Sequence, residues 1–324
     1  MAQSTKKQQT RLGSIIEFIG LLFIVFLIRT YGFGLYQVPT GSMETTILVG
    51  ERFFSDKLTY NFRGPRYGEI IAMNDPEYKY SDNYFKRLFQ RYVWGPQNWT
   101  KRIIGVPGDT IKGVIEDGKP VIYRNGEKLN EPYINAYPLL SELARDYDVV
   151  MHDIEAEIKR LQRQYNLDQA MINQYVMQRL SQEALAPRSY DSSKPYDQQY
   201  FYRFDEKRIL KDEDGNPMLI IPGTAMYPRD GKLSPDETRN NWNKSDVFFV
   251  KLGEDEYWGM GDNRLGSKDC RFFGPVKREQ IHGRLLARLW SIDSNEGWWI
   301  VDLFKNPIDY WRCVRWSRCY QWIY

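Results

Sequence analysis

Histidine is rare in this sequence, and its rarity narrows the chemistry that the chain can perform. Among 324 residues there are two histidines, His152 and His282. Neither lies in a Gly-x-Ser-x-Gly or His-Glu-x-x-His context, so the usual serine triad and the common zinc-protease motif are not predicted. We interpret both as surface or structural histidines. Acid–base chemistry would therefore have to come from another side chain.

Cysteine is almost as scarce. The three cysteines, Cys270, Cys313 and Cys319, form an odd set without a Cys-x-x-Cys pair. This pattern argues against a structural zinc site and against a disulfide framework. A bridge between Cys313 and Cys319 would require the chain to bend, because residues at that spacing on a helix point apart. We predict no metal and no cofactor.

The sequence also lacks a strong net charge and repeated hydrophobic segments. Its mean hydropathy is −0.60, which excludes a protein with many membrane spans. A net charge of +3 gives no indication of nucleic-acid binding, and we expect no such partner. Aromatic residues, in contrast, make up 15% of the chain, which is typical of a β-rich fold or of a protein at a membrane interface.

One apolar segment stands near the N-terminus. Residues 1–13 form a basic, polar tail, and residues 14–36 are apolar and aromatic over about the 20 residues that a spanning helix needs. A cleaved signal peptide is the alternative, but no small-x-small cleavage site follows the apolar run. We therefore expect a membrane anchor. Positive charge on its N-terminal side predicts a cytoplasmic N-terminus, with the rest of the chain outside.

The remainder is predicted to be a β protein with an insertion. Short β-branched and aromatic runs fill residues 37–135, where Asn125-Gly126 predicts a hairpin. Residues 136–246 form the insertion: apolar residues recur at helical spacing over 139–186, and a polar, loop-rich stretch follows. Strand patterns return in residues 247–290. The expected fold is mainly β: an antiparallel catalytic core, one transmembrane helix and an inserted helical segment.

The C-terminal segment, residues 291–324, is rich in tryptophan and arginine. Such side chains suit a lipid headgroup layer, but they also suit packing of a terminal element onto the fold. Both interpretations stay open. The residues concerned are Trp298, Trp299, Trp311, Trp316, Trp322, Arg312, Arg315 and Arg318.

A serine and a lysine stand out in two blocks of the β region. Residues 38–43 read Val-Pro-Thr-Gly-Ser-Met and include Ser42, and residues 101–109 read Lys-Arg-Ile-Ile-Gly-Val-Pro-Gly-Asp and begin with Lys101. A serine hydroxyl needs a base to become a nucleophile, and a neutral lysine can serve. Lowering a lysine pKa from about 10.4 to about 8 costs roughly 3 kcal/mol of solvation. Burial among apolar neighbours would provide this shift.

Together with a third block, Gly-Asp-Asn-Arg-Leu-Gly-Ser-Lys-Asp at residues 261–269, these segments resemble the bacterial type I signal peptidases. That family consists of membrane-anchored serine endopeptidases of β fold. The resemblance covers residues 36–135 and 247–290 and the Arg315-Trp316-Ser317-Arg318 sequence near the C-terminus. It implies that Ser42 is the nucleophile and Lys101 the general base. Thr40 and the Ser42 N–H would form the oxyanion hole, and Ser267 would orient the lysine amine.

The same resemblance assigns structural and substrate-binding residues. Charged positions of the family's framework fall on Arg102, Asp262, Arg264, Asp269 and Arg271, which we interpret as ion pairs. Shallow apolar pockets for small substrate side chains fall on Tyr36, Val38, Met43, Ile47 and Thr100. Such pockets imply cleavage after Ala-x-Ala-like sequences, since shallow pockets exclude bulky residues by steric conflict.

The resemblance thus implies removal of signal peptides from secreted preproteins at the outer face of the bacterial cytoplasmic membrane. The partners would be these preproteins and membrane lipid, and a position near the secretion translocon is compatible with this activity. One alternative is a catalytically inactive membrane-anchored scaffold of the secretion machinery. Another is a self-cleaving repressor, which would carry a helix-turn-helix in place of the anchor. A β-lactamase-like acyl enzyme would need a Ser-x-x-Lys motif. This motif occurs only at Ser4 and Lys7, in the basic tail before the apolar segment.

Overall fold

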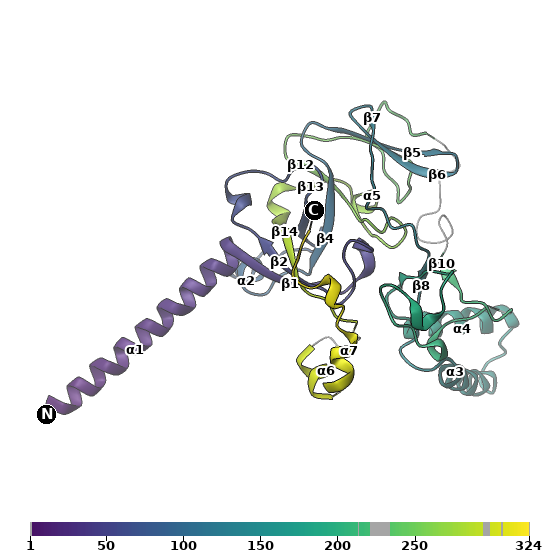
Figure 1. Cartoon of the computed structure of the whole chain (residues 1–324), viewed down its shortest axis with the longest axis horizontal. Coiled ribbons are helices and arrows are strands. Elements are labelled where there is room, and N and C mark those ends of the chain that lie inside the picture. Colours follow the sequence, from purple (N-terminus) through teal and green to yellow (C-terminus); the bar gives the residue numbers. More distant parts are fainter. Residues whose placement is uncertain (1, 213, 221–233, 294–298, 306, 324) are drawn as a thin grey trace.

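The apolar N-terminal segment forms one long helix that projects from the rest of the chain (Figure 1). The computed structural model describes residues 2–212, 214–220, 234–293, 299–305 and 307–323. Helix α1 spans Ala2–Leu27 and continues as the π-helical turn η1 over Ile28–Gly32. The stretch Gly13–Gly32 is long and apolar enough to cross a membrane, and its apolar window is not buried.

The predicted end of the anchor at residue 36 is wrong. Residues after Gly32 leave the helix and form strand β1, Phe33–Gln37, which pairs with strand β2. The apolar residues Phe33 and Leu35 alternate with Gly34 and Tyr36, a period that suits a strand better than a helix.

Strand β1 is the edge of the largest sheet, whose neighbouring strands are all antiparallel. Its order is β1-β2-β14-β3-β4-β12-β13, and β15 also pairs with β14. Strand β3 has both faces covered, because Ile71 and Met73 belong to one apolar cluster and Ile70 and Ala72 to another, so residues 70–73 are uniformly buried instead of alternating. The further strands are β2 (Arg52–Asp56), β3 (Ile70–Asn74), β4 (Asn98–Gly105), β12 (Glu256–Met260), β13 (Val276–Lys277), β14 (Ile281–Trp290) and β15 (Gln321–Trp322).

A second antiparallel sheet packs against the first through a shared apolar core. Its order is β11-β5-β6-β7, where β5 is Thr110–Glu116, β6 Lys119–Arg124, β7 Glu127–Lys128 and β11 Phe248–Lys251. The predicted Asn125-Gly126 hairpin is confirmed, because these two residues link β6 to β7 and both have positive φ, as the tight turn requires. Two short helices, α2 (Tyr84–Tyr92) and α5 (Cys270–Phe273), lie in connections of the main sheet. The shared core includes Ile71, Ile103, Ile111, Phe248 and Trp258.

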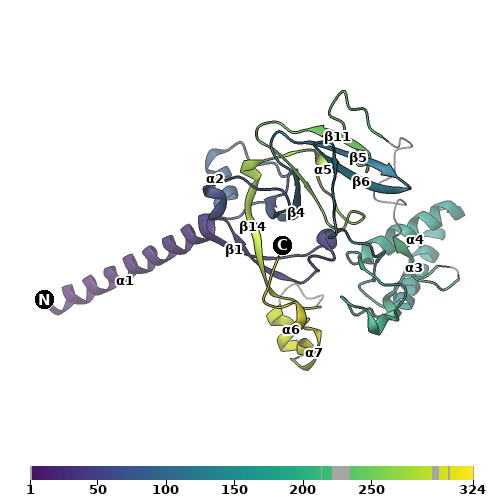
Figure 2. The ribbon, with the colours of Figure 1, turned by 45° about the horizontal axis from the view of Figure 1, so that its top comes forward.

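The inserted segment forms a subdomain that lies to one side of the main sheet (Figures 1 and 2). Helices α3 (Tyr147–Gln162) and α4 (Gln169–Glu183) pack together around Val150, Ile154 and Leu180. A small sheet, β10-β8-β9, comprises β8 (Leu139–Leu140), β9 (Arg188–Ser189) and β10 (Leu219–Ile220). Helix was predicted from residue 139, and this start is wrong, because Leu139 and Leu140 pair with two strands. The predicted mainly β fold with an inserted helical segment is confirmed.

The C-terminal segment folds back along the main sheet. Helices α6 (Trp299–Lys305) and α7 (Pro307–Cys313) precede β15. Arg318 Nε donates to the buried Glu51 at 2.7 Å, and Arg315 pairs with Asp293 at 3.1 Å, so both arginines are used in packing. Trp316 and Trp322 are 58% and 66% exposed, and lipid contact by them stays a prediction. Trp298 and the side chain of Trp299 lie outside the described residues. Arg312, which is exposed, pairs with Asp309. Neither Cys313 nor Cys319 forms a disulfide within the described residues.

Candidate active site

Ser42 lies on a single 3₁₀ turn, η2 (Gly41–Met43), between β1 and β2. The turn is held from the third block, because Asn263 donates its backbone N–H to Ser42 O at 3.1 Å and its Nδ2 to Gly41 O at 2.8 Å. Only 6% of the Ser42 surface is exposed. The sequence did not single out Asn263, although it is part of a block that was recognised.

Lys101 lies in the middle of β4, where its side chain reaches Ser42. Lys101 Nζ donates a hydrogen bond to Ser42 Oγ at 3.1 Å. Its backbone is paired with Ile71 of β3, and a Cβ at Gly259 of β12 would lie 3.2 Å from the Lys101 Cβ. The sheet therefore fixes the base of the lysine side chain on both sides, and the two residues named by separate sequence blocks meet.

Burial lowers the pKa of Lys101 to about 8, the direction that the sequence predicted. Desolvation of the ammonium is the largest cause, and the charges of Asp269 and Asp262 act against it. Residual negative charge nearby therefore keeps the pKa from falling further. An amine with this pKa is partly neutral near pH 8 and can accept a proton.

The predicted framework charges form buried ion pairs around Lys101. Arg102 donates two hydrogen bonds to Asp262, at 2.9 and 2.7 Å, and both side chains are almost fully buried. Arg271 pairs with Asp269 at 2.8 Å and with Asp246 at 2.7 Å. Arg264 pairs with Glu131, a partner that sequence reasoning missed because it lies outside the three blocks. These pairs tie the third block to both sheets.

Ser267 lies close to the turn η2, which we call the nucleophile turn after the predicted role of Ser42. Within the described residues no hydrogen bond joins Ser267 to Lys101. A Cβ at Gly261 would lie 2.2 Å from Ser267 Oγ and 2.4 Å from Ser42 O, so glycine is required for this approach. The Ser267 hydroxyl is buried, and in the described part of the chain it has no hydrogen-bond partner. Its role in orienting the lysine stays a prediction.

The other predicted site residues surround Ser42. Thr40 directly precedes the turn, is exposed and has an extended backbone. Four of the predicted pocket residues belong to one apolar cluster under the turn, and Thr100 is next to Lys101 on β4. Val38, Met43 and Ile47 are at most 2% exposed, so they belong to the packed core, and their role in a substrate pocket stays a prediction. The fourth member of the cluster is Tyr36.

A network that the sequence did not indicate links the nucleophile turn to the insertion. Glu44 is fully buried, and Ser189 N of β9 donates to Glu44 Oε2 at 2.6 Å. The hydroxyls of Ser189 and Tyr202 also donate to this carboxylate. Burial raises the pKa of Glu44, while these hydrogen bonds lower it. No local pattern signals such a contact, because its partners lie far away in the sequence.

The histidines take no part in this arrangement. His152 has a side chain that is 84% exposed, whereas His282 is partly buried and hydrogen-bonds Asn74. A hydroxyl, a buried amine of lowered pKa and apolar surface beside them are the parts required for acyl transfer by a serine nucleophile with a lysine base.

Comparison with known proteins shows the family of this chain. Residues 11–290 match the family model described as signal peptidase, peptidase S26. Signal peptidase I of Buchnera aphidicola subsp. Acyrthosiphon pisum is 24% identical over 94% of this chain and 83% of its own length. Signal peptidase I of Aquifex aeolicus is 26% identical over 86% of this chain and 83% of its own.

A crystal structure of a signal peptidase I from Enterococcus faecalis aligns with 69% of this chain and 97% of that chain. The identity is 19% and the TM-score 0.25, too low for a comparison of folds. The match to the family model, in contrast, extends over most of the sequence, from the anchor to the end of β14. This chain belongs to the signal peptidase family, peptidase S26.

Proposed function

We propose that this protein removes signal peptides from preproteins, with Ser42 as the nucleophile and Lys101 as the general base. The observation that carries the proposal is the 3.1 Å contact between the buried Lys101 amine and Ser42 Oγ. Burial of the amine supports the assignment, because an exposed lysine would be almost fully protonated at neutral pH.

The reaction would proceed by acyl transfer. Ser42 Oγ attacks the scissile carbonyl and gives its proton to the neutral Lys101 Nζ. The oxyanion is stabilised by hydrogen bonds from Thr40 Oγ1 and the Ser42 N–H. As the intermediate collapses, Lys101 returns the proton to the leaving amine, and the new N-terminus departs. Lys101 then takes a proton from water as the water attacks the ester. It returns this proton to Ser42 Oγ when the ester bond breaks, and the signal peptide leaves with its new carboxyl group.

The substrate is expected to bind in an extended conformation. Strand β1 is an edge of the main sheet, and its last residue, Gln37, lies just before the nucleophile turn. A segment added to this edge would have backbone hydrogen bonds and would lead toward Ser42. We expect a preference for small side chains, as in Ala-x-Ala sites, because Val38, Met43 and Ile47 are already packed in the core and leave little room for a bulky substrate side chain.

The position of the anchor supports a reaction at the membrane surface. The segment able to cross the membrane ends at Gly32, and the five-residue strand β1 and residues 38–40 separate it from the nucleophile turn. We propose that the basic N-terminus is cytoplasmic and that Ser42 faces the outer side. A preprotein anchored by its own apolar segment would then share this surface with the enzyme, which raises its effective concentration.

Processing of a secreted preprotein by the full-length chain in phospholipid vesicles tests the proposal. Ser42→Ala should lower the rate by on the order of 10⁴-fold or more, because the nucleophile is lost while the fold is kept. Ser193→Ala, in an exposed loop of the insertion, is the matched control and should process at the wild-type rate. Processing by Ser42→Ala at a wild-type rate would refute the assignment. Failure of the wild type to process any preprotein would favour the inactive scaffold.

A further inference from the structure

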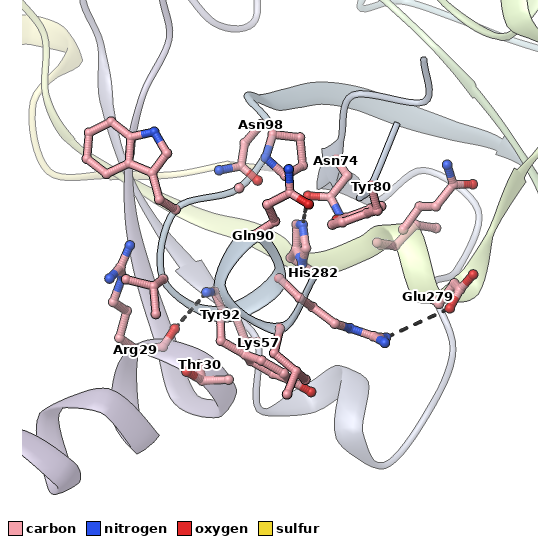
Figure 3. A pocket seen from close by; sticks show the side chains of 18 of the residues that line it. Arg29, Thr30, Lys57, Asn74, Tyr80, Gln90, Tyr92, Asn98, Glu279 and His282 are labelled. Atoms are coloured by element: carbon pink, nitrogen blue, oxygen red, sulfur yellow. Dashed lines mark hydrogen bonds and ion pairs between the residues drawn. The ribbon is translucent and has the colours of Figure 1, made fainter. Parts of the chain in front are cut away.

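A cavity of about 990 Å³ lies beside the end of the membrane-spanning helix. Of the residues assigned to the proposed reaction, Tyr36 lines it, whereas Ser42, Lys101 and Thr40 do not. Its lining comes from η1, from α2 and the chain after it, and from the start of β14 (Figure 3). In Figure 3, Arg29 and Lys57 lie at one end of the cavity, His282 and Asn74 near its centre, and Glu279 at the other end. Its volume is that of a site for a small molecule.

The cavity is strongly cationic. Its charged lining residues are Arg29, Lys57, Arg87, Arg91, Arg278 and a single carboxylate, Glu279. Of these five cations, Arg91 alone has an ion pair within the described part of the chain, with Glu279 at 3.8 Å. Lys57 Nζ instead donates to a backbone carbonyl, that of Arg29, at 2.7 Å. Concentrated like charges without matching carboxylates favour the binding of an anion.

Two titratable groups in the cavity respond to this positive field. Burial, followed by the charges of Lys57, Arg278 and Arg91, lowers the pKa of His282 to about 4. Burial and the charge of Arg29 likewise lower the pKa of Lys57. His282 is therefore neutral at physiological pH, and an anion in the cavity would relieve repulsion among the cations.

Helix α2 gives this cavity an apolar rim that is not packed on the protein. None of its residues is buried, and Phe85 and Phe89 are 78% and 54% exposed. Tyr84, Phe85, Leu88 and Phe89 lie on one side of the helix, whereas Lys86, Arg87 and Arg91 lie on the other. This division, with an exposed Trp94 after the helix, is typical of helices in a lipid headgroup layer.

The rim is continuous with the membrane-spanning helix. The ring of Phe26 in α1 lies 6.4 Å from that of Tyr92 at the end of α2. The cavity therefore opens where acyl chains along α1 would end and where phosphates would lie. We propose that it binds the phosphate headgroup of an anionic phospholipid, in the leaflet at which α1 ends. This inference rests on the anchor of the proposed function, but not on the catalytic assignment.

Native mass spectrometry of the full-length chain in detergent, with phosphatidylglycerol or phosphatidylcholine added, tests the proposal. The wild type should retain more phosphatidylglycerol than phosphatidylcholine. Arg87→Gln with Arg91→Gln should weaken that retention about tenfold, because two cations near the phosphate are lost. The matched control, Lys159→Gln with Arg239→Gln, removes two exposed cations that do not line the cavity and should bind as the wild type does.

Several results would overturn the proposal. Unchanged retention by the Arg87/Arg91 variant would do so, as would equal retention of both lipids by the wild type. Displacement of the lipid by equimolar sn-glycerol 3-phosphate would identify a soluble phosphoester as the ligand instead. The melting temperature of the variant should equal that of the wild type, since both arginines are exposed. Ser42→Ala should retain phosphatidylglycerol fully, so failure of the catalytic proposal is recognised separately.

Discussion

The proposed nucleophile, Ser42, and the proposed base, Lys101, are held in place by different parts of the molecule. Lys101 lies within a strand, and β3 and β12 flank it on both sides. Ser42 lies on one short turn, whose shape depends on hydrogen bonds from distant segments. Asn263 is 222 positions from Gly41, and Ser189 is 145 positions from Glu44. The position of Lys101 is therefore fixed by the core sheet, and the position of Ser42 is fixed by long-range hydrogen bonds.

This difference separates two kinds of functional change. Substitutions around Lys101 alter its desolvation and neighbouring charges, so they should move the pH dependence of the reaction. Substitutions around the nucleophile turn alter the position of Oγ, so they should lower the rate of the chemical step without moving the pH dependence. The insertion, through Glu44, belongs to the second kind.

Removing the amine itself should have the largest effect. Lys101→Met keeps the length of the side chain but provides no base, and processing should fall by on the order of 10⁴-fold or more. The free energy of unfolding at pH 7 should be unchanged or higher, because a poorly solvated ammonium is removed. Rates of peptide cleavage and thermal unfolding in detergent measure both quantities. Lys119→Met on β6, where the lysine is exposed, is the control. Residual activity that still rises with pH would point to another base.

The oxyanion donor should come next. Thr40→Val removes the hydroxyl but keeps the β-branched shape, and single-turnover cleavage should slow by about 10²–10³-fold with substrate affinity unchanged. Thr40→Ser restores a donor and should recover most of the rate. An unaffected rate in Thr40→Val would mean that other groups bind the oxyanion, and that Thr40 is not an oxyanion donor.

Loss of the contact between Glu44 and the insertion should lower the rate less than the changes above. It tests directly whether the surroundings of Ser42 and those of Lys101 have different effects. Glu44→Ala leaves the donors of Ser189 and Tyr202 without their acceptor, and the turn should shift. We expect kcat to fall by roughly 10–10², with the pH midpoint of kcat/KM unmoved. Glu254→Ala, an exposed carboxylate on the second part of the core, should be silent. A shifted midpoint in Glu44→Ala would show that the insertion acts on the base as well.

The sequence predicted the parts of this site whose determinants are local. The β pattern and the Asn125-Gly126 turn follow from short-range periodicity and turn chemistry. The roles of Ser42 and Lys101, in contrast, were predicted from the resemblance of their blocks to a known family. Pairings between distant segments have no such signature. Glu131 as the partner of Arg264 and Ser189 as the partner of Glu44 could not be predicted for this reason. Leu139 fits a helical spacing, but strand pairing overrides it.

The pH dependence of kcat/KM should report the ionisation of Lys101. With a Lys101 pKa of about 8, kcat/KM should rise about tenfold between pH 7 and 9 as the amine loses its proton. Stability should rise too, since between the folded pKa near 8 and the unfolded value near 10.5 the unfolded state binds more protons. Up to about 3 kcal/mol is regained across this range. Lys101→Met should lack this gain, and an equal gain in both proteins would assign it to other groups.

The smallest effect on the cleavage rate is expected for substitutions in the C-terminal segment, which contacts the chain just after the nucleophile turn through Glu51. Arg318 and Arg288 both donate to the buried carboxylate of Glu51, which in turn accepts from Leu48 N just after the nucleophile turn. Arg318→Gln leaves Arg288 in place, so we expect a loss of about 1–3 kcal/mol in the free energy of unfolding.

Cleavage of a preprotein in vesicles and of a short soluble peptide should then slow by the same small factor, because packing and not lipid contact is altered. Trp322→Ala, at an exposed side chain of the same segment, removes apolar surface without touching Glu51. A selective loss on the preprotein in Arg318→Gln would mean that this arginine serves the membrane surface, and the C-terminal segment would have to be grouped with α2 instead of with the core.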